Sequence, residues 1–224
     1  MGLTAQKCLS FLQSTVPLII TVVPDFSMAA IFIITWISPY AFQETMVKSL
    51  MLVMLLEFII MHSSVFMGGL IFSRGKRSKK ILYGLVLSGF YSIFAAAFSL
   101  AFKTWWPILA FWGLTLNRLM GIILSHTGMT EYKKKDLQST WGVSVAAYII
   151  FVIATTVIPL PALGITPECI YQQAFTGEGV WIDEPYRVLC FGFLYYAACG
   201  LYKMKIFSVN KCFPPYDLPQ DQLK

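Results

Sequence analysis

The stretch MVKSLMLVMLLEFIIMHSSVFMGGLIF, residues Met46–Phe72, decides the class of this protein. A helix gains about 1.5 Å per residue, so this run can cross the roughly 30 Å of hydrocarbon in a bilayer. Near its middle it carries Glu57 and His62. Ionisable groups are costly at that depth, and they mark either buried ion pairs or functional sites.

The composition extends this interpretation to the whole chain. Hydrophobic residues fill 57% of the 224 positions, charged residues fill 12%, and the mean hydropathy is +0.68. Soluble domains average about 45–50% apolar and about 25% charged residues. Because backbone polar groups in lipid must be satisfied within their own segment, the apolar runs are predicted to be helices. The predicted fold class is therefore all-α, a polytopic integral membrane protein.

Apolar runs bounded by charged or proline-containing stretches predict six transmembrane helices in one bundle. The expected spans are residues 16–37, 46–72, 81–102, 105–125, 141–158 and 186–207. They form a single domain over residues 1–211, and a short tail follows over residues 212–224. That tail is too short and too rich in proline to fold alone. We find no second domain and no convincing internal repeat.

The formal charge of +6 is distributed as membrane topology requires. Basic residues gather after the second span, in a loop predicted over residues 131–136, and at and just beyond the end of the sixth span at Lys203, Lys205 and Lys211. The first of these clusters consists of Arg74, Lys76, Arg77, Lys79 and Lys80. The positive-inside rule then predicts that both termini are cytoplasmic and that the acidic loop over residues 159–185 is outside. The cluster can also attract anionic lipid headgroups, and no nucleic-acid partner is needed to explain the charge.

The N-terminal run lacks a cleavage site, so no cleaved signal peptide is expected. The segment from Glu57 to Gly69 is similar in character to bacterial membrane proteins. We therefore expect a multi-pass protein of a bacterial inner membrane, with the lipid bilayer as its main partner.

Small residues on two spans predict close helix packing. Gly84, Ser88, Ser92 and Ala96 recur every four residues in the third span. Gly192 and Gly200, with Tyr196 between them, follow one side of the sixth. Faces of this kind let a neighbouring helix approach closely, within the bundle, in a homo-oligomer or in a complex with other membrane subunits.

Asp25 follows Pro24 and has two interpretations. If the first span begins near residue 16, the proline kinks it and Asp25 is an intramembrane ionisable residue. If residues 3–23 lie along the membrane surface instead, Asp25 stands at an ordinary helix N-terminus. The sequence leaves both open.

Glu57 has a predicted partner in Arg118 of the fourth span. Glu57 lies 17 residues before Arg74, and Arg118 lies 15 residues before Lys133, so the two share a depth. The pair can simply pin two helices together. It can also belong to a polar pathway for a proton or ion, whose other members are His62, Asn117, Ser64 and Asp25. Five residues turn a helix by about 140°, so Glu57 and His62 are predicted to face apart.

Cofactor and catalytic motifs are missing from the sequence. The five cysteines form no paired metal-binding motif, and His62 and His126 are the only two histidines. We predict no metal site, no catalytic residues and no cofactor, although a single haem or a quinone is weighed as an alternative. No nucleophile elbow, phosphate loop or dinucleotide fingerprint occurs, so the sequence does not favour an enzyme.

Three hypotheses on function follow. The favoured one is a transport or channel protein that moves a proton, ion or small solute through the polar interior of the bundle. The second is a structural or accessory subunit of a larger membrane complex. The third is a membrane enzyme subunit that binds haem, a metal or a quinone.

Overall fold

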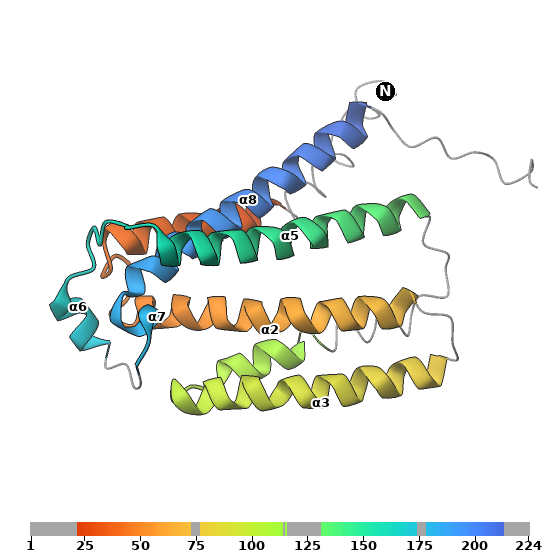
Figure 1. The fold of residues 1–224 in the computed structure, drawn as a ribbon, viewed down its shortest axis with the longest axis horizontal. Helices are drawn as coiled ribbons and strands as arrows, with labels where there is room; N and C mark the ends of the chain where they lie inside the picture. Colours follow the sequence, from red (N-terminus) through yellow and green to blue (C-terminus); the bar gives the residue numbers. More distant parts are fainter. Residues whose placement is uncertain (1–21, 73–76, 114, 116–130, 174–177, 213–224) are drawn as a thin grey trace, which may run out of the picture.

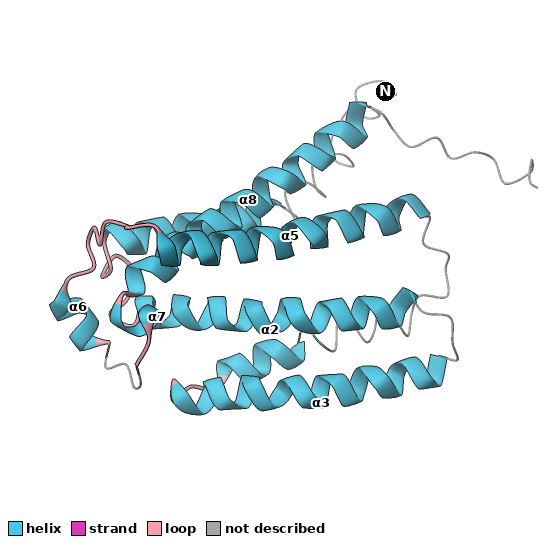
Figure 2. Cartoon of the chain, in the orientation of Figure 1, coloured by secondary structure: helices cyan, strands magenta, loops and turns pink. Residues whose placement is uncertain are grey.

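A computed structural model describes residues 22–72, 77–113, 115, 131–173 and 178–212. These residues form helices and connecting loops, and no strand occurs among them (Figure 2). Four predicted site residues lie outside the described part: Arg74, Lys76, Asn117 and Arg118. The predicted Glu57–Arg118 ion pair therefore stays a prediction.

The helices run back and forth as an antiparallel bundle (Figure 1). The long ones are Val22–Ile37, α2 (Met46–Phe72), α3 (Arg77–Ala101), α5 (Glu131–Val157) and α8 (Pro185–Cys212), and a helical segment covers residues 106–113. Two short helices, α6 (Pro167–Gln172) and α7 (Val180–Asp183), gather at one end of the bundle.

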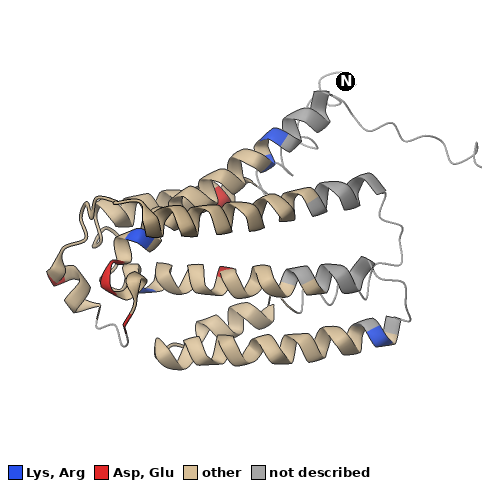
Figure 3. Cartoon of the chain, viewed as in Figure 1, with Lys and Arg blue, Asp and Glu red and all other residues tan. Residues whose placement is uncertain are grey.

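Three described helices are long and apolar enough to cross a membrane. Their apolar windows are Met46–Ser63, Ile81–Ala101 and Ser139–Val157, and Val22–Ile37 is a shorter apolar helix. Among the described residues, charged positions are sparse along the middle of the bundle (Figure 3). The prediction of an all-helical chain with helices of membrane-crossing length is confirmed to this extent.

The predicted loop over residues 131–136 is wrong. Helix α5 begins at Glu131, about ten residues before the predicted start of the fifth span. Hydropathy marks only the part of a helix that can lie in hydrocarbon. Glu, Lys and Gln are good helix formers, so the helix continues through the polar residues beyond that part.

The core has two parts. The larger cluster joins Val22–Ile37, α2, α5 and α8, and Phe32, Met54 and Phe191 are fully buried in it. The smaller cluster joins α2 to α3 and to segment 106–113, through Ile59, Ala95 and Phe111. Helix α2 thus touches both clusters and is the centre of the bundle.

The small-residue stripe of α3 starts as predicted and then drifts. Gly84 and Ser88 are buried, whereas Ser92 and Ala96 are only half-buried. The buried face continues instead through Tyr91, Ala95 and Ser99. Steps of four residues overshoot a helical turn of 3.6 residues by about 40° each, so a strict four-residue stripe leaves the contact face. Ser88 and Ser92 donate their hydroxyls to the carbonyls of Gly84 and Ser88, 2.7 Å away in both cases.

The glycines of α8 make room for helix Val22–Ile37. A Cβ atom added to Gly192 would lie 2.5 Å from the Cδ1 and Cζ atoms of the buried Phe32 ring. A Cβ atom on Gly200 would lie 3.1 Å from the Phe26 ring. The two helices approach closely because these positions carry no side chain.

The loop between α5 and α8 ties down helix ends that belong to other parts of the chain. The Gly164 amide donates to the Trp36 carbonyl at 3.1 Å, and the Trp36 indole donates to the Pro161 carbonyl, also at 3.1 Å. Gln173 is buried, and its amide group donates to the Glu44 carbonyl while its oxygen accepts from the Lys48 amide. Gln173 therefore caps the N-terminus of α2 from more than a hundred residues away.

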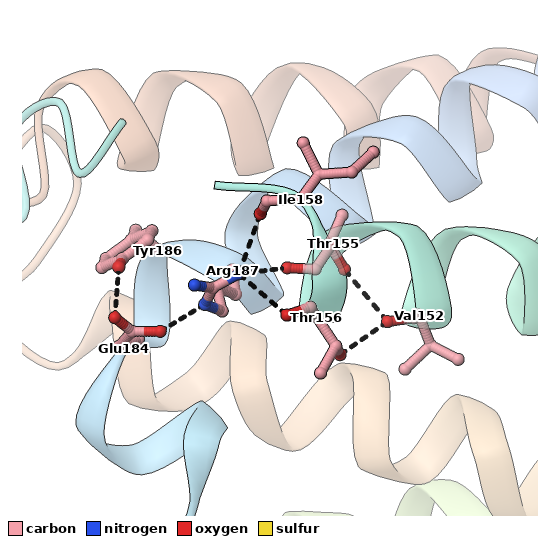
Figure 4. Close-up of polar contacts among 7 residues, drawn as sticks. All are labelled: Val152, Thr155, Thr156, Ile158, Glu184, Tyr186 and Arg187. Atoms are coloured by element: carbon pink, nitrogen blue, oxygen red, sulfur yellow. Dashed lines mark hydrogen bonds and ion pairs between the residues drawn. The ribbon is translucent and has the colours of Figure 1, made fainter. Parts of the chain in front are cut away.

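Arg187 caps the C-terminus of α5 (Figure 4). Its guanidinium donates to the carbonyls of Thr155, Thr156 and Ile158 at 2.8, 3.2 and 3.0 Å, and it forms an ion pair with Glu184. The last carbonyls of a helix have no partner within the helix, and a cation near them also matches the negative end of the helix dipole. Hydrogen bonds from Tyr186 and then from Arg187 lower the pKa of the Glu184 carboxyl below its usual value.

Candidate functional site: a polar cavity between four helices

Glu57 is held by Tyr195 of α8. The Tyr195 hydroxyl donates to Glu57 Oε1 at 2.7 Å and also lies 3.6 Å from the Met61 sulfur. Glu57 is eleven residues into α2 and Tyr195 is ten residues into α8, which places both about 15 Å along their helices. Tyr195 is only 3% exposed and Glu57 is half-buried, so this hydrogen bond is partly buried.

Asp25 is paired with Lys203. The Lys203 ammonium lies 2.7 Å from Asp25 Oδ2, and Asp25 is 9% exposed. The contact is an ion pair outside hydrogen-bonding geometry, because Oδ2 accepts no hydrogen bond from a described group. Lys203 is partly exposed, with 30% of its side chain accessible. The ammonium therefore lies between the buried carboxylate and the surface of the described structure.

These two pairs share one cavity of about 140 Å³. Helix Val22–Ile37, α2, α5 and α8 all contribute to its wall. The lining residues are Asp25, Glu57, Ile60, Met61, Trp141, Ser144, Tyr195, Tyr196, Cys199 and Lys203. Two carboxylates and one ammonium thus face a single small space.

Two polar atoms in the cavity wall have no hydrogen-bond partner among the described residues. They are Trp141 Nε1, a donor, and Asp25 Oδ2, an acceptor. Buried polar groups are satisfied in most proteins, so the unpaired Trp141 donor indicates a place for water or a ligand, whereas Asp25 Oδ2 already has the Lys203 ammonium 2.7 Å away. Cys199 and Ser144 are already in contact, with their sulfur and oxygen 3.6 Å apart.

Four aromatic rings pack against one another in and next to the cavity wall. Tyr148, Phe191, Tyr195 and Tyr196 form a chain of edge-to-face and tilted contacts with ring centres 4.7 to 6.3 Å apart. The Tyr148 hydroxyl donates to the Met54 carbonyl at 3.0 Å, which ties α5 to α2 beside the site. The packing fixes the direction in which Tyr195 presents its hydroxyl.

The predicted site residues separate in the structure. Asp25 and Glu57 line the same cavity, whereas His62 does not. His62 is exposed, its Nδ1 lies 3.0 Å from the Phe58 carbonyl, and its ring lies 4.1 Å from that of Phe58. Ser64 lies in α2, one residue after the buried Ser63. Of the residues predicted to form a polar pathway, Asp25 and Glu57 thus line one cavity, and His62 lies outside it.

The sequence interpretation missed the contribution of α8. Tyr195, Cys199 and Lys203 are four residues apart and share one helical face, and this spacing was the available signal. Lys203 alone resembles any other basic residue near a helix end. Its pairing with Asp25, 178 positions earlier, is fixed by tertiary packing.

The fold and the site define an all-helical protein with helices of membrane-crossing length and a polar cavity between four of its helices. No family model, curated protein or solved structure matches the chain. Among the described residues, no group of three or more His, Cys, Asp or Glu side chains is placed to hold a metal ion.

Proposed function

We propose that this chain is a six-span membrane protein with cytoplasmic termini that moves a proton or a small monovalent cation through the cavity at Asp25 and Glu57. One observation carries the proposal: two carboxylates from separate helices meet an ammonium in one cavity inside an apolar bundle. Intramembrane carboxylates of this kind line ion and proton routes in membrane proteins.

The geometry supports reversible occupation of the site by a cation. Glu57 receives a hydrogen bond from a neutral tyrosine, which stabilises the carboxylate without neutralising it. Asp25 holds Lys203, whose side chain is flexible and partly exposed and can leave the carboxylate when another cation arrives. A pair with a removable partner suits exchange better than a fully enclosed ion pair does.

The first prediction is that Glu57→Gln abolishes cation movement. The amide keeps the size of the side chain and can still accept from Tyr195, but it carries no charge and releases no proton. Purified protein is reconstituted into vesicles on a solid-supported membrane, and the currents that follow jumps in H⁺, Na⁺ or K⁺ concentration are recorded. We expect a current from wild type, and for Glu57→Gln a current at least about tenfold smaller.

Glu44→Gln is the matched control, because Glu44 is an exposed carboxylate in the loop before α2. It should conduct as wild type does. The transport proposal fails if Glu57→Gln gives wild-type currents.

A further inference from the structure

The cavity already contains one alkylammonium group, the end of the Lys203 side chain. This ammonium lies 2.7 Å from Asp25 Oδ2, and Glu57, Trp141 and Tyr195 line the same space. A wall that accommodates a tethered alkylammonium has the chemistry to accept a free one.

The groups around the cavity match the needs of a primary ammonium ion. Such an ion donates up to three hydrogen bonds and favours carboxylate acceptors. A carboxylate oxygen has two lone pairs, and Asp25 Oδ2 accepts no directed hydrogen bond from the described residues. Trp141, Tyr195 and Tyr196 add aromatic surface to the wall of the cavity.

The volume of the cavity suits a small ligand. A protein cavity of about 150 Å³ holds one benzene molecule. The cavity here, at about 140 Å³, therefore has room for an ammonium ion with a short carbon chain. The apolar side chains of Ile60 and Met61 in its wall suit that short chain.

We propose that this cavity is a binding site for small primary ammonium ions, and that the bound ion replaces the Lys203 ammonium at Asp25. The proposal deepens the transport function proposed above by naming the class of cation. Lys203 is then a tethered competitor, which keeps the carboxylate paired when no ligand is bound.

The attachment of the Lys203 ammonium to the protein determines how tightly wild type binds a free ammonium ion. A group attached to the site competes at an effective concentration on the order of millimolar or above. Removing the Lys203 ammonium should strengthen binding for two reasons: the competitor is gone, and the Asp25 carboxylate has lost its partner. Lys203→Met keeps an unbranched side chain and removes the charge.

The experiment uses the full chain in detergent and follows its thermal unfolding midpoint as ethylammonium chloride is added. Because a ligand that binds only the folded state raises this midpoint, we expect a saturable rise in Lys203→Met. Its half-point should lie at a concentration about tenfold or more below that for wild type. NaCl at equal ionic strength and ethanol at equal concentration are the controls for salt and for the carbon chain. The double variant Asp25→Asn/Lys203→Met should show no rise.

The proposal is overturned if Lys203→Met responds to ethylammonium as it does to NaCl, or if the double variant responds as strongly as the single one. Should Lys203→Met not fold, equilibrium binding of radiolabelled ethylammonium to wild type and to the conservative variant Asp25→Asn decides the same question. Equal binding to both would overturn the proposal. The binding experiment does not depend on the current measurement. Glu57-dependent currents without ammonium binding would therefore overturn the ammonium proposal and leave the transport proposal standing.

Discussion

Gly164→Ala is expected to lower the free energy of unfolding by about 3 kcal/mol, at the upper end of the range for overpacked sites. The new Cβ atom would overlap the Ile37 carbonyl oxygen and lie 2.8 Å from the carbonyl carbon. Both are backbone atoms at the end of helix Val22–Ile37, so no side-chain rotation relieves the contact. The Gly164 amide also bonds the Trp36 carbonyl, and moving the loop away would break that bond.

The matched control is Gly142→Ala in α5. A Cβ atom there meets no heavy atom within 4 Å. Alanine in a helix interior is favoured over glycine by about 0.5–1 kcal/mol, so this variant should unfold no earlier than wild type. Denaturant titration in detergent, followed by tryptophan fluorescence, measures both. A Gly164→Ala protein as stable as Gly142→Ala would show that the loop does not rest on Ile37 as described.

Arg187→Met is expected to destabilise the end of α5. The substitution removes the donor to three backbone carbonyls and leaves Glu184 without its cation. The long thioether keeps much of the apolar contact of the arginine stem, so the loss reports on the polar contacts. We expect the thermal unfolding midpoint to fall by several degrees.

Two further variants sharpen the test of Arg187. Arg187→Lys should recover only part of the loss, since a single ammonium cannot reach Glu184 and all three carbonyls as a planar fork does. Lys205→Met removes the same charge from an exposed position of α8 and should change little. If Arg187→Met and Lys205→Met unfold alike, Arg187 does not act as a cap.

Hydropathy was sufficient to predict the three described helices that are long and apolar enough to cross a membrane. The apolar run Met46–Phe72 predicted α2 because length and composition alone decide whether a segment can cross lipid. The same signal ends where polar residues begin. It therefore placed the start of the fifth span at residue 141, about ten residues after α5 begins at Glu131. Gly192 and Gly200 could be picked out as packing positions because small residues at helical spacing have few other uses.

The polar contacts could not be predicted, because each joins residues far apart in the chain. Their positions in or beside predicted apolar spans singled out Asp25 and Glu57 as candidates, but nothing local to either points to Lys203 or Tyr195. Gln173 and Arg187 cap helices that begin or end far away in the sequence. A cap within one segment leaves a local motif, whereas a cap from another segment depends on how the bundle is assembled.

The central claim, that a cation reaches Asp25 and Glu57 from both sides of the membrane, can be tested with a native reporter. Cys199 lines the cavity, whereas Cys190, which is equally buried in the same helix, does not. Two variants keep only one of these cysteines, and each is exposed in oriented vesicles to a small, membrane-impermeant cationic thiol reagent from either face. We predict that Cys199 is modified from both faces and Cys190 from neither. A Cys199 that stays as unreactive as Cys190, or that reacts from one face only, would contradict a transport path through this cavity.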